Sequence, residues 1–228
     1  MQISALNGAN VRIFGRRLNV WNRNCKHSNA IDSTEVQGFD RNTTMVRSRT
    51  ITQDEYKQHH AEFKIIYGFH SSPFGKCLVG VTDTDKAVAF LTFVDDSNEK
   101  GLAKLKSCWP LSELVEDNDN ETSQIMETIF PSGTIVNNSL TLLLMGTEFQ
   151  IKVWQSLLDI PKATTVTYEQ VAQNINNPKA VRAVGNAVMK NKVVYLVPCH
   201  RVKGKSGSNK YKWGPELKET ILSYERQE

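Results

Sequence analysis

The segment VVYLVPCHRV, residues 193–202, holds the side chains best suited to covalent chemistry, because Cys199 is followed directly by His200. A free thiol with a pKa of about 8.5 is mostly protonated at neutral pH, so a nucleophilic cysteine needs a base or a positive charge beside it. Neighbouring side chains of a strand point to opposite faces, but a bend at Pro198 would bring this thiol and imidazole together. A distant carboxylate that orients the imidazole would complete a Cys-His-acid arrangement. The competing interpretation is a buried, unreactive cysteine.

The composition places this chain among globular proteins. Of its 228 residues, 39% are hydrophobic and 23% are charged, values typical of one or two folded domains. No apolar run approaches the roughly 18 residues that cross a bilayer, so we expect no membrane association. The four cysteines are far apart and form no CxxC pair, which predicts reduced thiols, no metal and no cofactor. Zinc bound through Cys25, His27 and a distant histidine is an alternative that the spacing supports only weakly.

Charge is distributed unevenly along the sequence. Residues 32–146 contain 10 basic and 17 acidic residues, whereas residues 147–228 contain 13 basic and 7 acidic residues. A basic segment is typical of proteins that bind a polyanion such as nucleic acid, although a solvated basic surface gives the same count. The Cys-His pair lies inside this basic segment.

The first 55 residues differ in composition from the rest. They are rich in Asn, Arg, Ser and Thr and show no sustained hydrophobic period, so residues 1–55 are predicted to form an irregular arm. The first acidic residue is Asp32, and arginines recur before it among small and apolar residues, which loosely resembles an organelle transit peptide. We favour an adaptor or disordered arm and a cytoplasmic protein, at the nucleoid in a bacterium or in the nucleus of a eukaryote.

Residues 56–145 are predicted to form an N-terminal α/β subdomain. The runs FKIIYGF, KCLVGV and KAVAFLTFV, which start at Phe63, are short and rich in β-branched and aromatic residues. They predict a three-stranded antiparallel meander with a turn near Thr82 to Asp85. Helices are expected over residues 98–109 and 121–130, because a proline follows each segment.

Residues 146–228 are predicted to form a second, mostly helical module. Thr147-x-x-Gln150 and Thr167-x-x-Gln170 have the pattern of capping boxes, which predicts a helix over 147–159 and another from 167. Asn177-Pro178 is expected to cap a third helix over residues 179–190. The second and third helices, joined by a short polar turn, form a helix-turn-helix candidate.

The predicted third helix carries unusually small side chains. Ala180, Ala183, Gly185 and Ala187 would let a backbone approach closely, while Arg182 projects from the same helix. In a soluble protein the approaching element is usually another helix. The alternative is a nucleic-acid groove with Arg182 inserted into it. The residues alone leave both interpretations open.

Five motifs occur in order over residues 146–228: GTEFQIKVWQSL, VTYEQVA, NPKAVRAVGNAV, VPCHRV and YKWG. Together they resemble the O6-alkylguanine-DNA alkyltransferase family, and especially the C-terminal module of Ada-type proteins. The resemblance implies an α/β (α+β) fold. Its small N-terminal subdomain would be ribonuclease H-like with a three-stranded antiparallel sheet, and its C-terminal subdomain mostly helical with a helix-turn-helix. It also implies DNA repair: a single, irreversible transfer of an alkyl group from O6 of guanine, and less efficiently O4 of thymine, to a cysteine after nucleotide flipping.

The resemblance assigns roles to individual residues. Cys199 is the alkyl acceptor, His200 the base that acts through a water molecule, Glu225 the acid that polarises the histidine, and Asn191 the support of the turn before the active strand. Tyr168 and Arg182 are expected to rotate the nucleotide and to fill its place in the duplex. The remaining expected DNA contacts are Ala180, Ala183, Gly185 and Arg201, and the expected contacts to the flipped base are Val197, Pro198, Tyr211 and Trp213.

The expected partner is double-stranded DNA containing O6-alkylguanine, bound through its minor groove by a monomer. One rival is a DNA-damage binding protein that has lost transfer; such relatives replace the cysteine, whereas Cys199 is intact. A second rival is a Cys-His hydrolase, which would need an oxyanion pocket and would turn over repeatedly. Stoichiometry therefore separates transfer from hydrolysis.

Overall fold

The computed structural model describes residues 33–34, 45–94, 97–132, 139–205 and 211–227. Residues 31–228 form one compact unit. Most of the predicted arm, including Cys25 and His27, lies outside the described residues.

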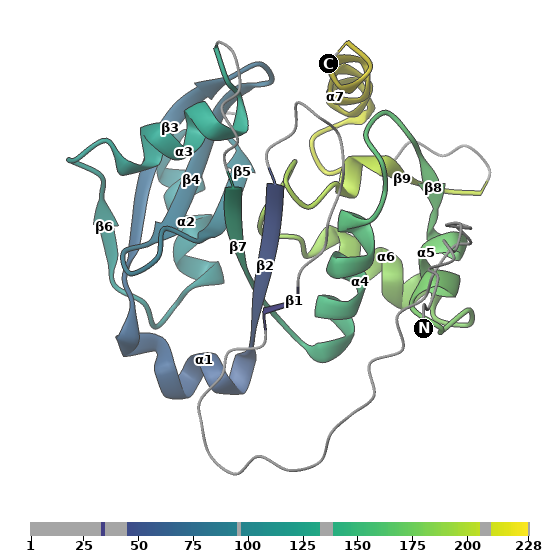
Figure 1. The fold of residues 1–228 in the computed structure, drawn as a ribbon, viewed down its shortest axis with the longest axis horizontal. Coiled ribbons are helices and arrows are strands. Elements are labelled where there is room, and N and C mark those ends of the chain that lie inside the picture. The colour runs from purple at the N-terminus through teal and green to yellow at the C-terminus, as the bar shows by residue number, and fades with distance from the viewer. Residues whose placement is uncertain (1–32, 35–44, 95–96, 133–138, 206–210, 228) are drawn as a thin grey trace, which may run out of the picture. The chain divides into compact units, whose positions relative to one another are not determined.

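A seven-stranded mixed sheet forms the first part of the described chain (Figure 1). Its order is β1-β2-β7-β5-β4-β3-β6, and β3, β4 and β5 are the predicted antiparallel meander. Three strands were predicted, whereas the sheet has seven. The sheet is larger because β2, β5 and β7 associate in parallel across long sequence separations. The strands are β1 (Ser33–Thr34), β2 (Met45–Thr52), β3 (Ile65–Ser72), β4 (Gly75–Thr82), β5 (Val88–Phe93), β6 (Leu114–Glu116) and β7 (Ser139–Gly146).

The predicted irregular arm is wrong for residues 45–55. Met45–Thr52 is strand β2, paired with β7 along its whole length, and helix α1 (Gln53–His59) follows directly. The strand escaped prediction because its centre, residues 47–50, is a run of four polar residues with no apolar alternation. Ser48 of this run is buried, and Arg49 forms an ion pair with Asp85 at 3.0 Å.

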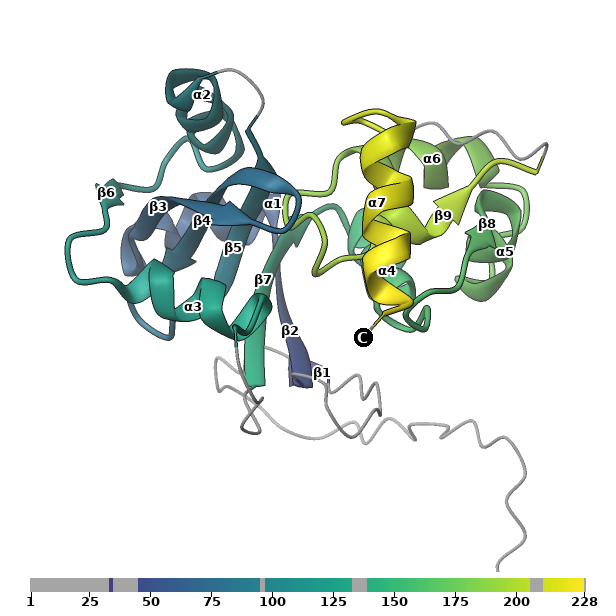
Figure 2. The same ribbon diagram turned by 90° about the horizontal axis from the view of Figure 1, so that it is seen from above.

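Helices cover both faces of this sheet. In Figure 2, α2 (Asn98–Cys108) and α3 (Glu121–Ile129), both predicted, lie on opposite sides of it. Side chains of β4 alternate between two cores, as the two-residue period of a strand requires: Leu78 packs with Leu105 of α2, whereas Cys77 and Val79 pack with α3 and the C-terminal helices.

The C-terminal part is mostly helical. Both predicted capping boxes are present, at the starts of α4 (Glu148–Leu158) and α5 (Tyr168–Asn174). The third helix begins later than predicted: the amide of Ala180 donates to Asn177 O at 3.0 Å, so Asn177 and Pro178 form a turn and do not cap a helix. The other elements are α6 (Val181–Met189), α7 (Pro215–Glu225), the short strands β8 (Val166–Thr167) and β9 (Val202–Lys203), and the 3-10 turns η1 (His60–Glu62) and η2 (Cys199–Arg201).

The two parts share a core. The predicted boundary at Gly146 falls between β7 and α4, yet Leu142 of β7, Trp154 of α4 and Val184 of α6 belong to one buried cluster. A Cβ at Gly146 would lie 2.7 Å from the Trp154 ring, so only glycine fits this junction. The fold is therefore a mixed α/β architecture with a continuous interior. No helix in the described ranges is long and apolar enough to cross a membrane.

Candidate active site

The segment before Cys199 is a pinned turn, and the prediction of a strand there is wrong. Val193 makes a single parallel bridge with Leu91 of β5, and the chain then reverses at Tyr195, whose φ is +71°. The amide of Val197 donates to Val193 O at 2.9 Å and closes the turn. Asn191 spans it: Nδ2 donates to Val197 O at 2.8 Å, and Oδ1 accepts from the Val193 amide at 2.9 Å. The Asn191 side chain therefore connects the two ends of the turn.

Cys199 begins the 3-10 turn η2, so the expected bend at Pro198 is present. The Cys199 amide donates to Val197 O at 2.8 Å, and the Arg201 amide donates to Pro198 O at 3.0 Å. The thiol is 6% exposed. Burial raises its pKa, against the smaller opposing effects of the Asn191 and Tyr211 side chains. The thiol is consequently protonated at rest, and a base must remove its proton before it can attack.

His200, the base that the resemblance implies, follows the thiol directly in η2. It is fully buried, and its Nε2 lies 2.7 Å from Oε1 of Glu225. Burial opposes ionisation of Glu225, but hydrogen bonds from His200 and Arg201 outweigh it and lower its pKa to about 2. An ionised carboxylate only accepts hydrogen bonds, so Nε2 carries the proton and Nδ1 keeps its lone pair. Nδ1 is buried and has no hydrogen-bond partner in the described part of the chain.

The Arg201 side chain contacts Glu225 and does not extend into solvent. Its Nη2 donates to Oε1 at 2.7 Å, its Nε lies 3.1 Å from the same oxygen, and its Nη1 donates to Ile160 O. The side chain is only 11% exposed. These contacts do not support the expected DNA contact of Arg201, and we assign it to positioning Glu225. The second oxygen of Glu225 accepts from the Ala163 amide at 2.9 Å.

Two residues near the site were missed by the sequence analysis. Lys218 of α7 is 1% exposed, its Nζ donates to Val202 O at 2.7 Å, and its charge acts to lower the pKa of Cys199. Its signal was present in the sequence, because Lys218 shares helical spacing with Ile221, Leu222 and Glu225 on the buried face of α7. Tyr195 stacks on the His200 imidazole, with ring centroids 6.0 Å apart, and only the unexpected turn brings it there.

Of the three aromatic residues expected at the substrate, Tyr168 and Tyr211 lie near the thiol. Tyr168, the first residue of α5, is half-buried, and burial together with the charge of Cys199 raises its pKa. Tyr211 Oη is buried near the thiol without a hydrogen bond of ordinary geometry, and burial raises its pKa. Both hydroxyls therefore stay protonated and can donate. Trp213 packs on Phe93 and donates to its carbonyl at 3.2 Å, so its indole is fixed against β5.

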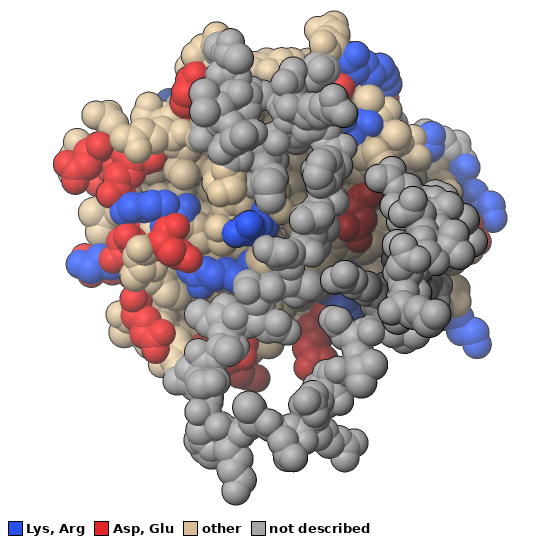
Figure 3. All heavy atoms as spheres, viewed as in Figure 1, with Lys and Arg blue, Asp and Glu red and all other residues tan. Residues whose placement is uncertain are grey.

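Helix α6 presents small residues to open space. Ala183 is exposed, and nothing lies within 4 Å of a Cβ placed on Gly185, so no neighbouring helix explains these residues. Ala187 differs, because it is buried and its carbonyl accepts from Trp154 Nε1 at 2.9 Å. Arg182 is exposed on the same helix. Figure 3 shows Lys and Arg side chains along the edge that carries β8 and β9, and acidic ones at the opposite edge near β6.

Comparison with known proteins identifies the family. A family model described as the DNA binding domain of 6-O-methylguanine DNA methyltransferase matches residues 148–227. The inducible methylated-DNA–protein-cysteine methyltransferase of Bacillus subtilis is 37% identical over 148 residues, which cover 64% of this chain and 83% of that protein. The chain belongs to the methylated-DNA–protein-cysteine methyltransferases. A second family member, from Methanosarcina mazei, is 39% identical over 62% of this chain and 85% of its own.

Solved structures agree with this methyltransferase assignment. The structure of OGT from Mycobacterium tuberculosis in complex with DNA superposes with a TM-score of 0.54 at 27% identity, covering 71% of this chain and 93% of that one. The mixed α/β fold expected of the methyltransferase is thereby confirmed. No group of three or more His, Cys, Asp or Glu side chains in the described ranges could hold a metal ion.

Proposed function

We propose that this methyltransferase repairs DNA by moving an alkyl group, methyl above all, from O6 of guanine to Cys199 in a single irreversible turnover. The observation that carries the proposal is the Cys199-His200-Glu225 arrangement. A buried thiol is joined through one turn to an imidazole whose Nε2 is held by an ionised carboxylate, leaving Nδ1 as a buried acceptor.

The chemistry follows from these protonation states. His200 Nδ1 takes the thiol proton through one water molecule, and the thiolate attacks the alkyl carbon. The carbon–oxygen bond to O6 breaks, its electron pair stays on the base, and the proton released by the thiol ends on guanine. Tyr168 and Tyr211, both kept protonated by burial, support donation to the base as it leaves. The thioether product has no base-catalysed route back, so each molecule acts once.

A buried thiol cannot reach an alkyl group inside a duplex, so the nucleotide must leave the stack, at a cost of a few kcal/mol. We assign the compensation to Arg182, which enters the minor groove as the nucleotide leaves. The exposed Ala183 next to Arg182, and the open space beside Gly185, support close approach of α6 to the groove. In this proposal α5 and α6 act as a helix-turn-helix, Ala180 lies at the start of the contact, and Val197 and Pro198 line the pocket for the extruded base.

Finer features of the family belong to the same proposal. The meander β3-β4-β5 with helices on both sheet faces supports a ribonuclease H-like N-terminal subdomain. The proposal also includes action as a monomer on duplex DNA. It further includes transfer of an alkyl group from O4 of thymine. A non-catalytic DNA-damage binding protein is not favoured, because the acceptor thiol, its base and its acid are all in place.

The deciding experiment uses a duplex with a labelled O6-methylguanine. We expect at most one label bound per protein molecule, no label on Cys199→Ala, and unchanged labelling of Cys108→Ala as the control. Repeated turnover, or label retained by Cys199→Ala, contradicts the proposal.

The role of Arg182 is tested by comparing two substrates. Arg182→Ala should slow reaction with the duplex at least tenfold, which corresponds to about 1.4 kcal/mol, and leave reaction with free O6-benzylguanine nearly unchanged. Equal losses on both substrates would remove Arg182 from nucleotide rotation.

A further inference from the structure

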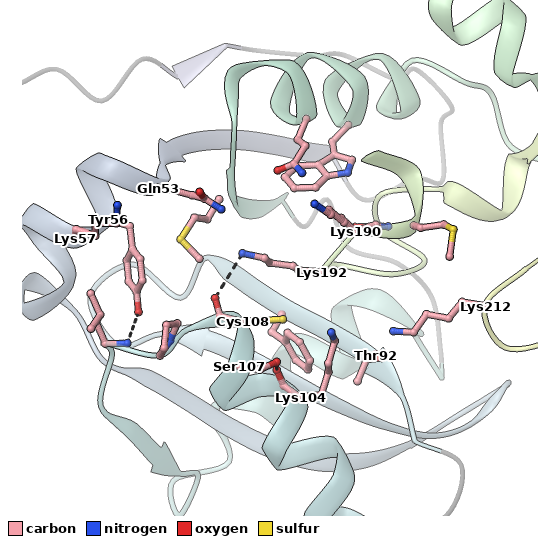
Figure 4. A pocket seen from close by; sticks show the side chains of 18 residues that line it. Gln53, Tyr56, Lys57, Thr92, Lys104, Ser107, Cys108, Lys190, Lys192 and Lys212 are labelled. Atoms are coloured by element: carbon pink, nitrogen blue, oxygen red, sulfur yellow. Dashed lines mark hydrogen bonds between the residues drawn. The ribbon is translucent and has the colours of Figure 1, made fainter. Parts of the chain in front are cut away.

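A cavity separate from the thiol lies between α1, α2, β5 and the segment after α6. Its volume is about 600 Å³, within the usual range for small-molecule sites. The residues that line it do not include Cys199, Tyr168 or Tyr211, so it is not the pocket for the flipped base. Figure 4 shows side chains from the sheet part and from the C-terminal part converging on it.

The described lining of this cavity is strongly basic. It contains five lysines and no Asp or Glu: Lys57, Lys104, Lys190, Lys192 and Lys212. Lysines elsewhere are commonly paired, as Lys64 is with Glu113 at 3.0 Å and Lys86 with Glu121 at 2.7 Å. By contrast, Lys104, Lys190 and Lys192 form no ion pair with any described residue. Three of the five cavity lysines therefore lack an ion-pair partner among the described residues, whereas Lys57 pairs with Asp54 at 2.9 Å.

Lys192 is the most recessed of the five. Its Nζ lies 3.5 Å from Cys108 O and 5.4 Å from the centre of the Trp109 ring, which are weak contacts for an ammonium group. Burial lowers its pKa, the charge of Cys108 opposes this shift, and the smaller effect of the Lys104 charge lowers the pKa further. Like charges brought together without an anion cost free energy, and a bound anion would remove that cost.

We propose that this cavity binds a small phosphorylated anion carrying at least two phosphate groups. The lysines come from four different segments, α1, α2, the stretch after α6 and the stretch before α7, and this distribution around a cavity of about 600 Å³ favours a ligand with more than one phosphate. Tyr56, Phe90 and Trp154 add an apolar wall, which suits an organic group attached to the phosphates. A recessed ammonium such as Lys192 fits a compact ligand better than the outer surface of a duplex.

The test is calorimetric titration of the whole 228-residue chain with inorganic triphosphate at low salt. Lys104→Gln/Lys192→Gln should weaken binding at least tenfold, and Lys104→Arg/Lys192→Arg should retain most of it. The matched control is Lys106→Gln/Lys179→Gln, which removes the same charge from exposed lysines outside the cavity. We expect less than a twofold change for this control.

Each contrary result overturns the proposal. Absence of triphosphate binding at millimolar concentration does so directly, and equal weakening in the control shows nonspecific attraction to a basic surface. The last experiment repeats the triphosphate titration in the presence of saturating duplex DNA. If the DNA blocks triphosphate binding, and the cavity variant loses as much affinity for duplex as for triphosphate, the lysines contact the DNA backbone. Unchanged thermal unfolding of the glutamine variant separates lost binding from lost folding.

Discussion

Glu225 joins the fold to the chemistry, so replacing it with glutamine should affect both. Its pKa lies at about 2 instead of 4.5, and each pKa unit corresponds to about 1.4 kcal/mol. Ionised Glu225 therefore stabilises the folded protein by about 3 kcal/mol at neutral pH. Glu225→Gln removes that contribution and leaves the guanidinium of Arg201 without its counter-charge. We expect the free energy of unfolding to fall by about 3 kcal/mol and Tm by about 6–12 °C.

The pH dependence gives this prediction its sharpest form. A carboxyl with a lowered pKa contributes its full stability above the unfolded value, near 4.5, and loses it as pH falls toward 2. Urea unfolding, followed by tryptophan fluorescence, should therefore show a gap between wild type and Glu225→Gln that is complete at pH 7 and narrows below about pH 4.5.

Glu216→Gln is the matched control, because this exposed carboxylate lies in the first turn of the same helix. Its loss should stay below about 1 kcal/mol. A gap for Glu225→Gln under about 1 kcal/mol at pH 7, or one that does not change with pH, would refute the electrostatic reasoning.

Three further changes test other parts of the site. Asn191→Ala removes both hydrogen bonds that span the turn, so the free energy of unfolding should fall by about 2 kcal/mol and alkyl transfer from O6-benzylguanine should slow. An unchanged rate would mean that the turn keeps its conformation without the Asn191 side chain. Burial lowers the pKa of His200 below 6.5, so the imidazole stays neutral and the transfer rate should fall only at pH values below 6.5; a decline that begins above 6.5 would contradict this. Gly146→Ala should destabilise the protein by about 1–3 kcal/mol in urea unfolding, because its Cβ meets the Trp154 ring, whereas Gly185→Ala, with open space at its Cβ, should not.

Features fixed by local sequence were predictable. The capping boxes at Thr147 and Thr167 set the starts of α4 and α5 within a few residues of chain, and the turn between β4 and β5 followed from a short polar run. Strand β2 was not predictable in this way, because its only long partner, β7, lies about 90 residues further along the chain.

The site shows the same division. Cys199, His200 and Glu225 were assigned through ordered motifs, and in the structure His200 Nε2 lies 2.7 Å from Glu225 Oε1. The contact between Arg201 and Glu225 could not be foreseen, because it depends on how α7 packs against η2. The left-handed backbone of Tyr195 also ran against expectation, since an apolar run of this kind usually extends as a strand.

The bridge between Leu91 and Val193 lets the sheet position the segment that carries Cys199. Two backbone hydrogen bonds, each 2.9 Å long, tie the segment before Cys199 to β5. A fragment that starts at Gly146 would keep every side chain proposed to touch DNA or the alkyl group. It would lose β5, the strand that holds the segment before Cys199 in position. Such a fragment would be expected to bind damaged DNA but to transfer the alkyl group poorly. The difference would arise from two backbone hydrogen bonds that take no direct part in the chemistry.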